Sequence, residues 1–240
     1  PPSYEIGDMT FRNWNRGVDE GRMDLATALM RSCDTYFYEL SHTQWQREQR
    51  LISDNDGDLD GVDEVLSRVA REFGFGRTLG IDLPSEASGT IPDRATKQAV
   101  WLERRERWCA QAEVAEDDYQ RAILQDNCLY GGAWRGGDAV NTSIGQGEIL
   151  TTPLQVAASY AAVANGGTLY RPHLGQRIVD PSGEVVREIE PEGIGTLPID
   201  DETLRVMQEG LRDVVMHPRG TGHTAFAGFP FDEVGVAGKT

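Results

Sequence analysis

Lysine is almost missing from this 240-residue chain, because Lys97 and Lys239 are the only lysines among 23 basic residues. Acidic residues number 39, so the formal net charge is −16. A surface of this charge repels the phosphate backbone of nucleic acids and the anionic face of lipid bilayers. A nucleic-acid partner is therefore not expected, and each of the two lysines is easy to follow.

Long apolar runs are missing as well. No stretch approaches the roughly 18 to 20 apolar residues that a membrane-spanning helix needs. The N-terminal segment PPSYEIGDMT has neither the basic start nor the apolar centre of a signal peptide. With 39% apolar residues the composition is that of an ordinary globular protein with a core. We expect the chain itself to be soluble, and any membrane anchor to lie outside it.

Cysteine is scarce. Cys33, Cys109 and Cys128 fit neither a disulfide-rich scaffold nor the paired close spacings of a zinc site. The four histidines show no ligand spacing either. A Cys109–Cys128 bridge is possible outside the cell, but it forms only if the backbone brings the two cysteines within about 7 Å. The sequence leaves this question open.

The spacing of apolar residues favours short strands among several helices. A break at Ser32–Asp34 divides the helical segment 23–42, since serine and aspartate favour helix caps over helix interiors. Residues 46–61 are polar and predict a loop. Periodicity and turn residues predict helices over 65–73, 101–125, 154–165 and 201–217, and strands within 167–180, 184–189 and 231–240. Pro181, Ser182 and Gly183 predict a hairpin turn between the first two strand segments. No regular βαβ alternation is present, which favours an α+β fold with an antiparallel sheet.

The last three residues, Gly238, Lys239 and Thr240, suggest two kinds of site. A phosphate-binding loop is excluded, because it needs a glycine where Glu233 stands and a helix after the lysine. On a strand, an ammonium and a hydroxyl can hold a substrate carboxylate by charge-assisted hydrogen bonds. Such a triplet alone is more often a solvated turn, so the interpretation depends on a partner.

Ser32 and Asp34 are the candidate partner. A hydroxyl can relay a proton, and an acid two positions later can orient a lysine or an amide. By itself a Ser-X-Asp segment is more often only a helix cap. The glycines of SIGQG, Gly145 and Gly147, indicate by themselves only a tight bend of the backbone.

Five stretches taken together carry much more information. They are GRMDLATALMRSCDTYFYEL, FGFGRTLGIDLPSEASGTIP, GDAVNTSIGQGEILTTPLQVAASYAAVANGGTLYRPHL, RGTG and VAGKT, in this order. The set resembles the transpeptidase domain of class B penicillin-binding proteins over most of the chain. Ser-Cys-Asp in place of Ser-X-Asn, followed by TYFYEL, looks most like the penicillin-binding protein 2 branch, which serves cell elongation. The resemblance implies the transpeptidase and β-lactamase-like α+β fold, an antiparallel sheet flanked by helices, incomplete at both ends.

The resemblance also implies a mechanism. Family members transfer an acyl group through the serine of a Ser-X-X-Lys motif, faced by Ser-X-Asn and Lys-Thr-Gly motifs. By this match Ser32 relays a proton and helps position the motif's lysine, while Asp34 contacts that lysine or the substrate amide. Lys239 and Thr240 bind the terminal carboxylate of a D-alanyl-D-alanine stem peptide or of a β-lactam. No cofactor is implied.

One motif of the family is absent from these residues. No Ser-X-X-Lys occurs, since Arg94 and Val236 stand three positions before the two lysines. In the family this motif lies upstream, before Pro1. We therefore expect residues 1–240 to be the central part of the domain, without the nucleophile and inactive alone. The resemblance places the complete protein on the outer face of the cytoplasmic membrane, held by an N-terminal anchor, with the cell-wall elongation machinery as partner.

Two insertions depart from the family's usual length, at about 41–60 and 94–130. The first contains Asp56, Asp58 and Asp60, which match the start of a calcium loop, although Ser67 stands where the bidentate glutamate belongs. Glu64 can contribute instead, and the alternative is a solvated acidic loop.

The second insertion contains the helix predicted over 101–125, with Cys109 within it and Cys128 just after it. It either docks a partner or packs on the flank of the domain through Trp101, Trp108 and Tyr119.

Other activities share this fold. A β-lactam sensor or a catalytically silent penicillin-binding module is the alternative outside the enzymes, and a β-lactamase or D,D-carboxypeptidase is the alternative among enzymes. A hydrolase must release its acyl group to water quickly, so the rate of deacylation separates these possibilities.

Overall fold

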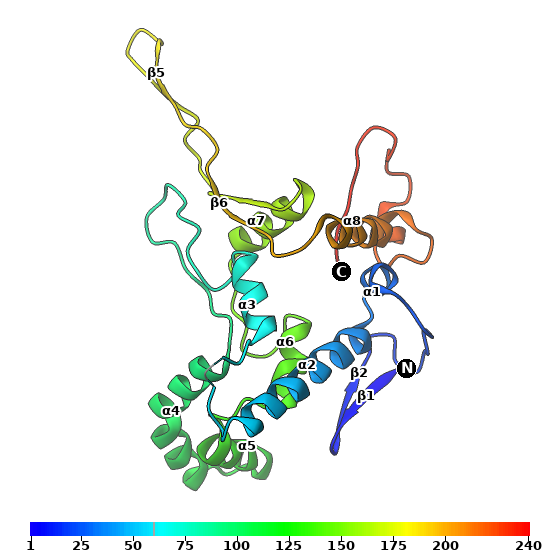
Figure 1. The fold of residues 1–240 in the computed structure, drawn as a ribbon, viewed down its shortest axis with the longest axis vertical. Helices are drawn as coiled ribbons and strands as arrows, with labels where there is room; N and C mark the ends of the chain where they lie inside the picture. The colour runs from blue at the N-terminus through cyan, green and yellow to red at the C-terminus, as the bar shows by residue number, and fades with distance from the viewer. Residues whose placement is uncertain (60) are drawn as a thin grey trace.

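The computed structural model describes residues 1–59 and 61–240, in which helices make up most of the body, one antiparallel ribbon (177–188) projects from it and another (3–12) lies at its edge (Figure 1). The helices are α1 (Leu25–Arg31), α2 (Asp34–Asp54), α3 (Val65–Glu72), α4 (Arg94–Val114), α5 (Asp118–Tyr130), α6 (Gly136–Ser143), α7 (Pro153–Ala164), α8 (Asp201–Met216) and the 3-10 turn η1 (His223–Phe226). The strands are β1 (Ser3–Ile6), β2 (Met9–Arg12), β3 (Thr168–Tyr170), β4 (Arg177–Val179), β5 (Val185–Glu188) and β6 (Gly193–Thr196). Over this part of the chain, none of the helices has the length and hydropathy needed to cross a bilayer.

The break between α1 and α2 confirms the prediction around Ser32. Asp24 caps α1 by accepting a hydrogen bond from the Thr27 backbone N–H at 2.8 Å. Ser32 ends the helix in the left-handed conformation, and α2 begins two residues later. The predicted loop over 46–61 is wrong for its first half, because α2 continues to Asp54. The buried Glu48 receives a hydrogen bond from Arg94 Nη1 at 2.8 Å, a tertiary contact that fixes this polar end of the helix.

The second insertion folds as two helices, so the single helix predicted over 101–125 is wrong. Asp117 starts α5 by accepting from the Gln120 backbone N–H at 2.7 Å. A disulfide between Cys109 and Cys128 joins α4 to α5, which answers the question the sequence left open. Tyr119 is 77% exposed and does not pack as predicted.

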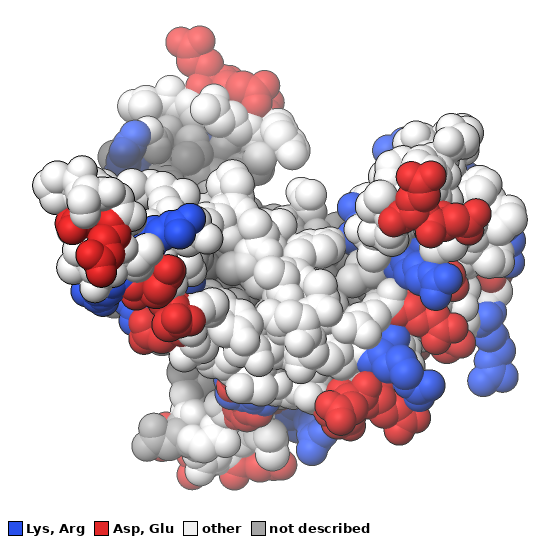
Figure 2. Space-filling view, turned by 90° about the horizontal axis from the view of Figure 1, so that it is seen from above, with Lys and Arg blue, Asp and Glu red and all other residues white. Residues whose placement is uncertain are grey.

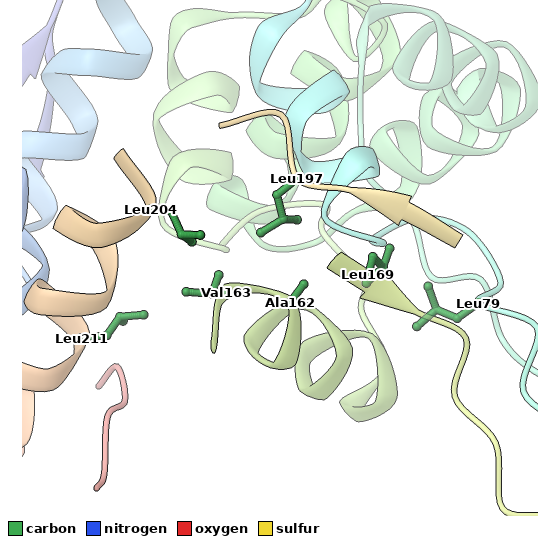
Figure 3. Close-up of a cluster of buried hydrophobic side chains, with 7 residues drawn as sticks. All are labelled: Leu79, Ala162, Val163, Leu169, Leu197, Leu204 and Leu211. Carbon is green, nitrogen blue, oxygen red and sulfur yellow. The ribbon is translucent and has the colours of Figure 1, made fainter. Parts of the chain in front are cut away.

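The hydrophobic core lies where α7, α8 and the β3–β6 ribbon meet (Figure 3). Thr152 and Gln155 form a reciprocal capping box at the start of α7, and Pro153 occupies the first turn, where its missing N–H costs nothing. Both helices at this core match their predictions. The buried side chains are Leu79, Ala162, Val163, Leu169, Leu197, Leu204 and Leu211.

The strands pair as three separate two-stranded antiparallel ribbons within the described residues, β1–β2, β3–β6 and β4–β5, rather than as one sheet. The hairpin predicted around 181–183 is confirmed, and Asp180 holds it by accepting from the Ser182 and Glu184 backbones. The β1–β2 hairpin turns on Gly7-Asp8, with Gly7 at φ 60°. A Gly-Asp pair between strands is a known hairpin signal. This hairpin is missing from the sequence-based prediction.

The strand predicted over 231–240 is wrong. This segment is irregular, because a strand needs a neighbouring ladder and none of the described strands lies beside it. Its backbone is instead anchored by the Gly238 N–H, which donates to the carbonyl of Leu211 in α8 at 3.0 Å.

Candidate functional site

The C-terminal segment runs to the junction of α1 and α8, close to the helix break (Figure 1). Lys239 Nζ donates to Ser32 Oγ at 2.5 Å, across 207 positions of sequence. Ser32 Oγ in turn donates to the backbone oxygen of Thr240 at 3.0 Å. The fold therefore brings together three of the predicted site residues, Ser32, Lys239 and Thr240.

The backbone of Ser32 determines where its hydroxyl lies. Ser32 has φ 53° and ψ 45°, a left-handed conformation that residues with a Cβ adopt rarely. Its N–H donates to the carbonyl of Leu29, and the Cys33 N–H donates to that of Ala28. These bonds close α1 as a helix C-cap. The chain then turns into α2 with the serine hydroxyl beside the C-terminal segment.

Asp34 stands at the first position of α2 and adds a negative charge to the site. Its Oδ2 accepts from the Trp14 backbone N–H at 3.1 Å. Burial raises the pKa of the Asp34 carboxyl, and the Trp14 hydrogen bond and the Lys239 charge partly oppose that shift. Burial also disfavours the charged form of Lys239 and so lowers the pKa of its ammonium, and the Asp34 charge opposes this shift. The two groups therefore support each other's charged form.

Thr221 completes the cluster and had no predicted role. Its Oγ1 lies 2.6 Å from Thr240 Oγ1. Its backbone N–H and its hydroxyl both donate to the Met30 carbonyl at 3.3 Å, which ties the segment after α8 to α1. Thr221 belongs to the RGTG stretch, so the resemblance contained its signal.

The buried carboxylate of Glu20 binds an arginine from each of the two segments that form the cluster. The Glu20 side chain is 5% exposed and accepts from Arg31 Nη2 at 2.6 Å and from Arg219 Nη2 at 3.3 Å. The Arg31 hydrogen bonds are the main reason that the pKa of Glu20 lies below its usual value. Arg31 precedes Ser32, and Arg219 stands two residues before Thr221. Glu20 therefore fixes both sides of the cluster.

The calcium interpretation gains no support here. Across 1–59 and 61–240, no three His, Cys, Asp or Glu side chains gather as metal ligands. Asp56 and Asp58 belong to this part of the chain, whereas Asp60 lies outside the described residues.

A cavity away from the site lies in the helical part of the described chain. It measures about 690 Å³ and lies between α2, α3 and α6, lined among others by Tyr36, Trp45 and Trp134. None of the clustered residues Ser32, Thr221 or Lys239 lines it.

The geometry supports two chemical tasks. The Lys239 ammonium and the hydroxyls of Thr221 and Thr240 form a group of donors suited to a carboxylate. The Ser32 hydroxyl, bonded to Lys239, can pass a proton to or from a neighbouring group. Acyl transfer also needs a serine activated by an adjacent base. No Ser-X-X-Lys motif in residues 1–240 supplies that pair.

Comparison with known proteins agrees with this description. The family model described as the penicillin binding protein transpeptidase domain matches residues 1–240. The peptidoglycan D,D-transpeptidase MrdA of Salmonella typhimurium is 26% identical over 232 residues, which are 96% of this chain and 29% of that protein. The chain thus spans less than a third of this relative.

Solved structures show the same similarity. PBP2 of Pseudomonas aeruginosa in complex with WCK 5153 has a TM-score of 0.62 and 28% identity, over 95% of this chain and 39% of that one. The complex of PBP2 with MreC from Helicobacter pylori gives a TM-score of 0.60 and 27% identity, over 95% of this chain and 32% of that one.

Proposed function

Because the chain belongs to the penicillin-binding protein transpeptidase domain family, we propose that it is the central part of a peptidoglycan D,D-transpeptidase of cell elongation. The complete protein cross-links stem peptides through a serine acyl-enzyme. The observation that carries this proposal is the cluster of Ser32, Thr221, Lys239 and Thr240, because it unites a carboxylate-binding cation with a proton-relaying serine.

Ser32, Lys239 and Thr240 of the cluster, and Asp34 beside it, each have a role in this reaction. Lys239 and Thr240 bind the terminal carboxylate of a stem peptide ending in D-Ala-D-Ala, or that of a β-lactam. Ser32 relays the proton between the nucleophile's lysine and the leaving amine. Asp34 keeps the neighbouring ammonium groups charged and faces the substrate amide.

The nucleophilic serine belongs to residues of the complete protein outside 1–240. The chain is the central part of the domain, with insertions at about 41–60 and 94–130, and alone it forms no acyl adduct. No cofactor takes part.

The partners and the location proposed for the complete protein are argued from its relatives and from the Cys109–Cys128 disulfide. The P. aeruginosa relative binds WCK 5153 and the H. pylori relative binds MreC. From the family's description as penicillin binding and from the MreC complex, we extend to this protein the binding of β-lactams and of the elongation machinery. The Cys109–Cys128 disulfide supports a location outside the cytoplasm, since such bonds persist in oxidising compartments. We place the protein on the outer face of the cytoplasmic membrane, held by an N-terminal anchor.

The test is labelling with a fluorescent penicillin. The complete gene product should gain one penicillin on a serine outside residues 1–240, and the isolated chain should gain none. An adduct within residues 1–240 contradicts the location of the nucleophile, and a complete protein without any adduct contradicts the proposed function. Rapid release of the hydrolysed penicillin instead identifies a β-lactamase or carboxypeptidase.

Lys239→Met tests the carboxylate site. Acylation should slow by about 10- to 100-fold, because a hydrogen bond to a charged group contributes roughly 1.5–3 kcal/mol and each 1.4 kcal/mol is about tenfold. Arg104→Met removes an exposed positive charge from α4 and serves as the matched control, with an unchanged rate expected. Equal rates for Lys239→Met and the control exclude Lys239 from substrate binding.

A further inference from the structure

We infer that Asn13 is a positioning residue for the proposed acyl transfer, because it holds Ser32 in its left-handed conformation and Asp34 in place. The inference rests on the proposed function of the Ser32 cluster. Asn13 lies outside every motif of the resemblance and has no predicted role.

The conformation of Ser32 requires an explanation. Only Ser32, Asp56 and Ser85 have a positive φ among the non-glycine residues of the described chain. A residue with a Cβ adopts this region reluctantly and stays there only when its surroundings hold it. The hydroxyl of Ser32 reaches Lys239 from this conformation. Whatever holds the backbone therefore also holds the hydroxyl.

Asn13 is bonded to the two residues that follow Ser32. Its Oδ1 accepts from the Asp34 backbone N–H at 3.0 Å, and its Nδ2 donates to Cys33 Sγ at 3.7 Å. The side chain is 1% exposed, so water does not compete for these bonds. The backbone N–H of Asn13 donates to the Pro2 carbonyl at 3.0 Å, which anchors it to the N-terminal hairpin.

Trp14 extends this attachment to the residue before Ser32. Its backbone N–H donates to Asn13 Oδ1 and to Asp34 Oδ2, at 3.1 Å each. Its indole Nε1 donates to the Arg31 carbonyl at 3.0 Å. Residues 13 and 14 thus bond to the Arg31–Ser32 peptide unit before Ser32 and to the Cys33–Asp34 peptide unit after it, and they orient the Asp34 carboxylate directly.

Loss of these hydrogen bonds should displace the Ser32 hydroxyl and have little effect on carboxylate binding. Without the bonds from Asn13, residues 33 and 34 are less restrained, and Ser32 can move toward an ordinary helical or extended conformation. This movement displaces its hydroxyl from Lys239. Displacements of about 1 Å in catalytic groups can cost on the order of 100-fold in rate. Thr240 keeps its bond to Thr221, and Gly238, which precedes Lys239, keeps its bond to the Leu211 carbonyl, so carboxylate binding is largely retained.

The experiment is penicillin acylation of the complete gene product, with the noncovalent affinity and the acylation rate constant measured separately. Asn13→Ala should lower the rate constant by about 10- to 100-fold and change the affinity by less than about threefold. Asn13→Asp keeps an oxygen for the two backbone N–H donors and should recover most of the rate.

Asn165→Ala is the matched control. Asn165 also makes two side-chain bonds to backbone, to the oxygen and the N–H of Thr168 at 2.8 and 2.9 Å, and it bonds none of the cluster residues. It should lower the melting temperature without changing the acylation rate constant. Equal slowing by Asn13→Ala and Asn165→Ala means general destabilisation and overturns the inference.

Other outcomes are equally decisive. A folded Asn13→Ala protein that acylates at the wild-type rate overturns the inference. If Asn13→Ala does not fold, Trp14→Phe removes only the indole bond to Arg31 and should slow acylation several-fold, and an unchanged rate then overturns the inference. A wild-type protein that forms no adduct refutes the proposed function itself, which is a different result from wild-type acylation without dependence on Asn13.

Discussion

At the scale of residues, the two lysines show how surroundings decide a role. Burial disfavours the charge of Lys97, but Asp138 and Glu148 bind its ammonium at 2.9 and 3.0 Å, and its pKa is raised overall. Within the described residues Lys239 forms no ion pair with an Asp or Glu side chain; it donates to Ser32 Oγ and to the backbone oxygen of Thr240, and burial lowers its pKa. Lys97 therefore has its charge neutralised within the fold, whereas the charge of Lys239 is left for a ligand.

Asp34→Asn tests the coupling between Asp34 and Lys239. The Asp34 charge opposes the fall of the Lys239 pKa, so its removal lowers that pKa further. The ammonium that binds the carboxylate is then lost at a lower pH, and the alkaline limb of the acylation profile moves to lower pH. Acylation rates between about pH 6 and 10 measure this shift, across the range where a perturbed lysine titrates.

The melting temperature is the control for Asp34→Asn. A raised carboxyl pKa means that stability falls as the pH rises through it, so the charged Asp34 is unfavourable at neutral pH. Asp34→Asn should therefore melt at pH 7 no lower than the wild type. Superimposable pH profiles contradict the coupling.

Prediction of the site residues from sequence depended on the kind of contact involved. Ser32, Lys239 and Thr240 stand in motifs whose residue types indicate their chemistry, and the fold brings them together. Asn13 and Thr221 act through hydrogen bonds to backbone groups 21 and 191 positions away. Such contacts depend on the tertiary fold, and no periodicity or spacing reports them.

At the scale of elements, local signals predicted boundaries well where a cap or turn residue is present. The break after Arg31, the start of α7 at Pro153 and the turn after Asp180 all follow such residues. The α4–α5 boundary was missed because apolar residues continue at helical spacing through Asp117, which caps the second helix. The end of α2 was missed because a buried ion pair, rather than apolar periodicity, stabilises it.

The Cys109–Cys128 disulfide should stabilise the α4–α5 pair substantially. It closes a loop of 19 positions, for which restricting the unfolded chain contributes about 3 kcal/mol. Replacing both cysteines by alanine should lower the free energy of unfolding by about that amount in urea titrations. A reducing agent should destabilise the wild type alone, which provides the control. In unfolded wild-type protein without reductant, only the Cys33 thiol should react with a thiol reagent. Three reactive thiols contradict the disulfide.

At the scale of the whole molecule, the net negative charge disfavours the approach of an anionic ligand to the site. The net charge of −16 would repel, at long range, the anionic stem peptide proposed as the substrate. Seen from above, the middle of this face is mostly uncharged, and acidic and basic side chains lie around its periphery (Figure 2). Recognition of a carboxylate must therefore come from the short-range donors around Lys239. Binding should depend little on general electrostatic steering.

The site is also assembled from segments far apart in sequence, and Glu20 joins them. It links Arg31, next to Ser32, with Arg219, next to the Thr221 stretch. Glu20→Gln leaves these two cations without their counter-charge, so we expect a loss of about 1–3 kcal/mol in unfolding free energy at pH 7. Acylation should slow too, since both sides of the cluster lose their support.

The pH dependence of the unfolding free energy distinguishes the charge interactions of Glu20 from a contribution through packing. The pKa of Glu20 is lowered in the fold, so its contribution is complete above the unfolded pKa of about 4.3 and disappears as the pH falls through the folded value. The stability difference between wild type and Glu20→Gln should therefore be constant near neutrality and shrink in acid. Urea titrations at several pH values measure it. A difference that persists unchanged in acid means that Glu20 acts through packing, and the charge linkage between the two halves of the site is then wrong.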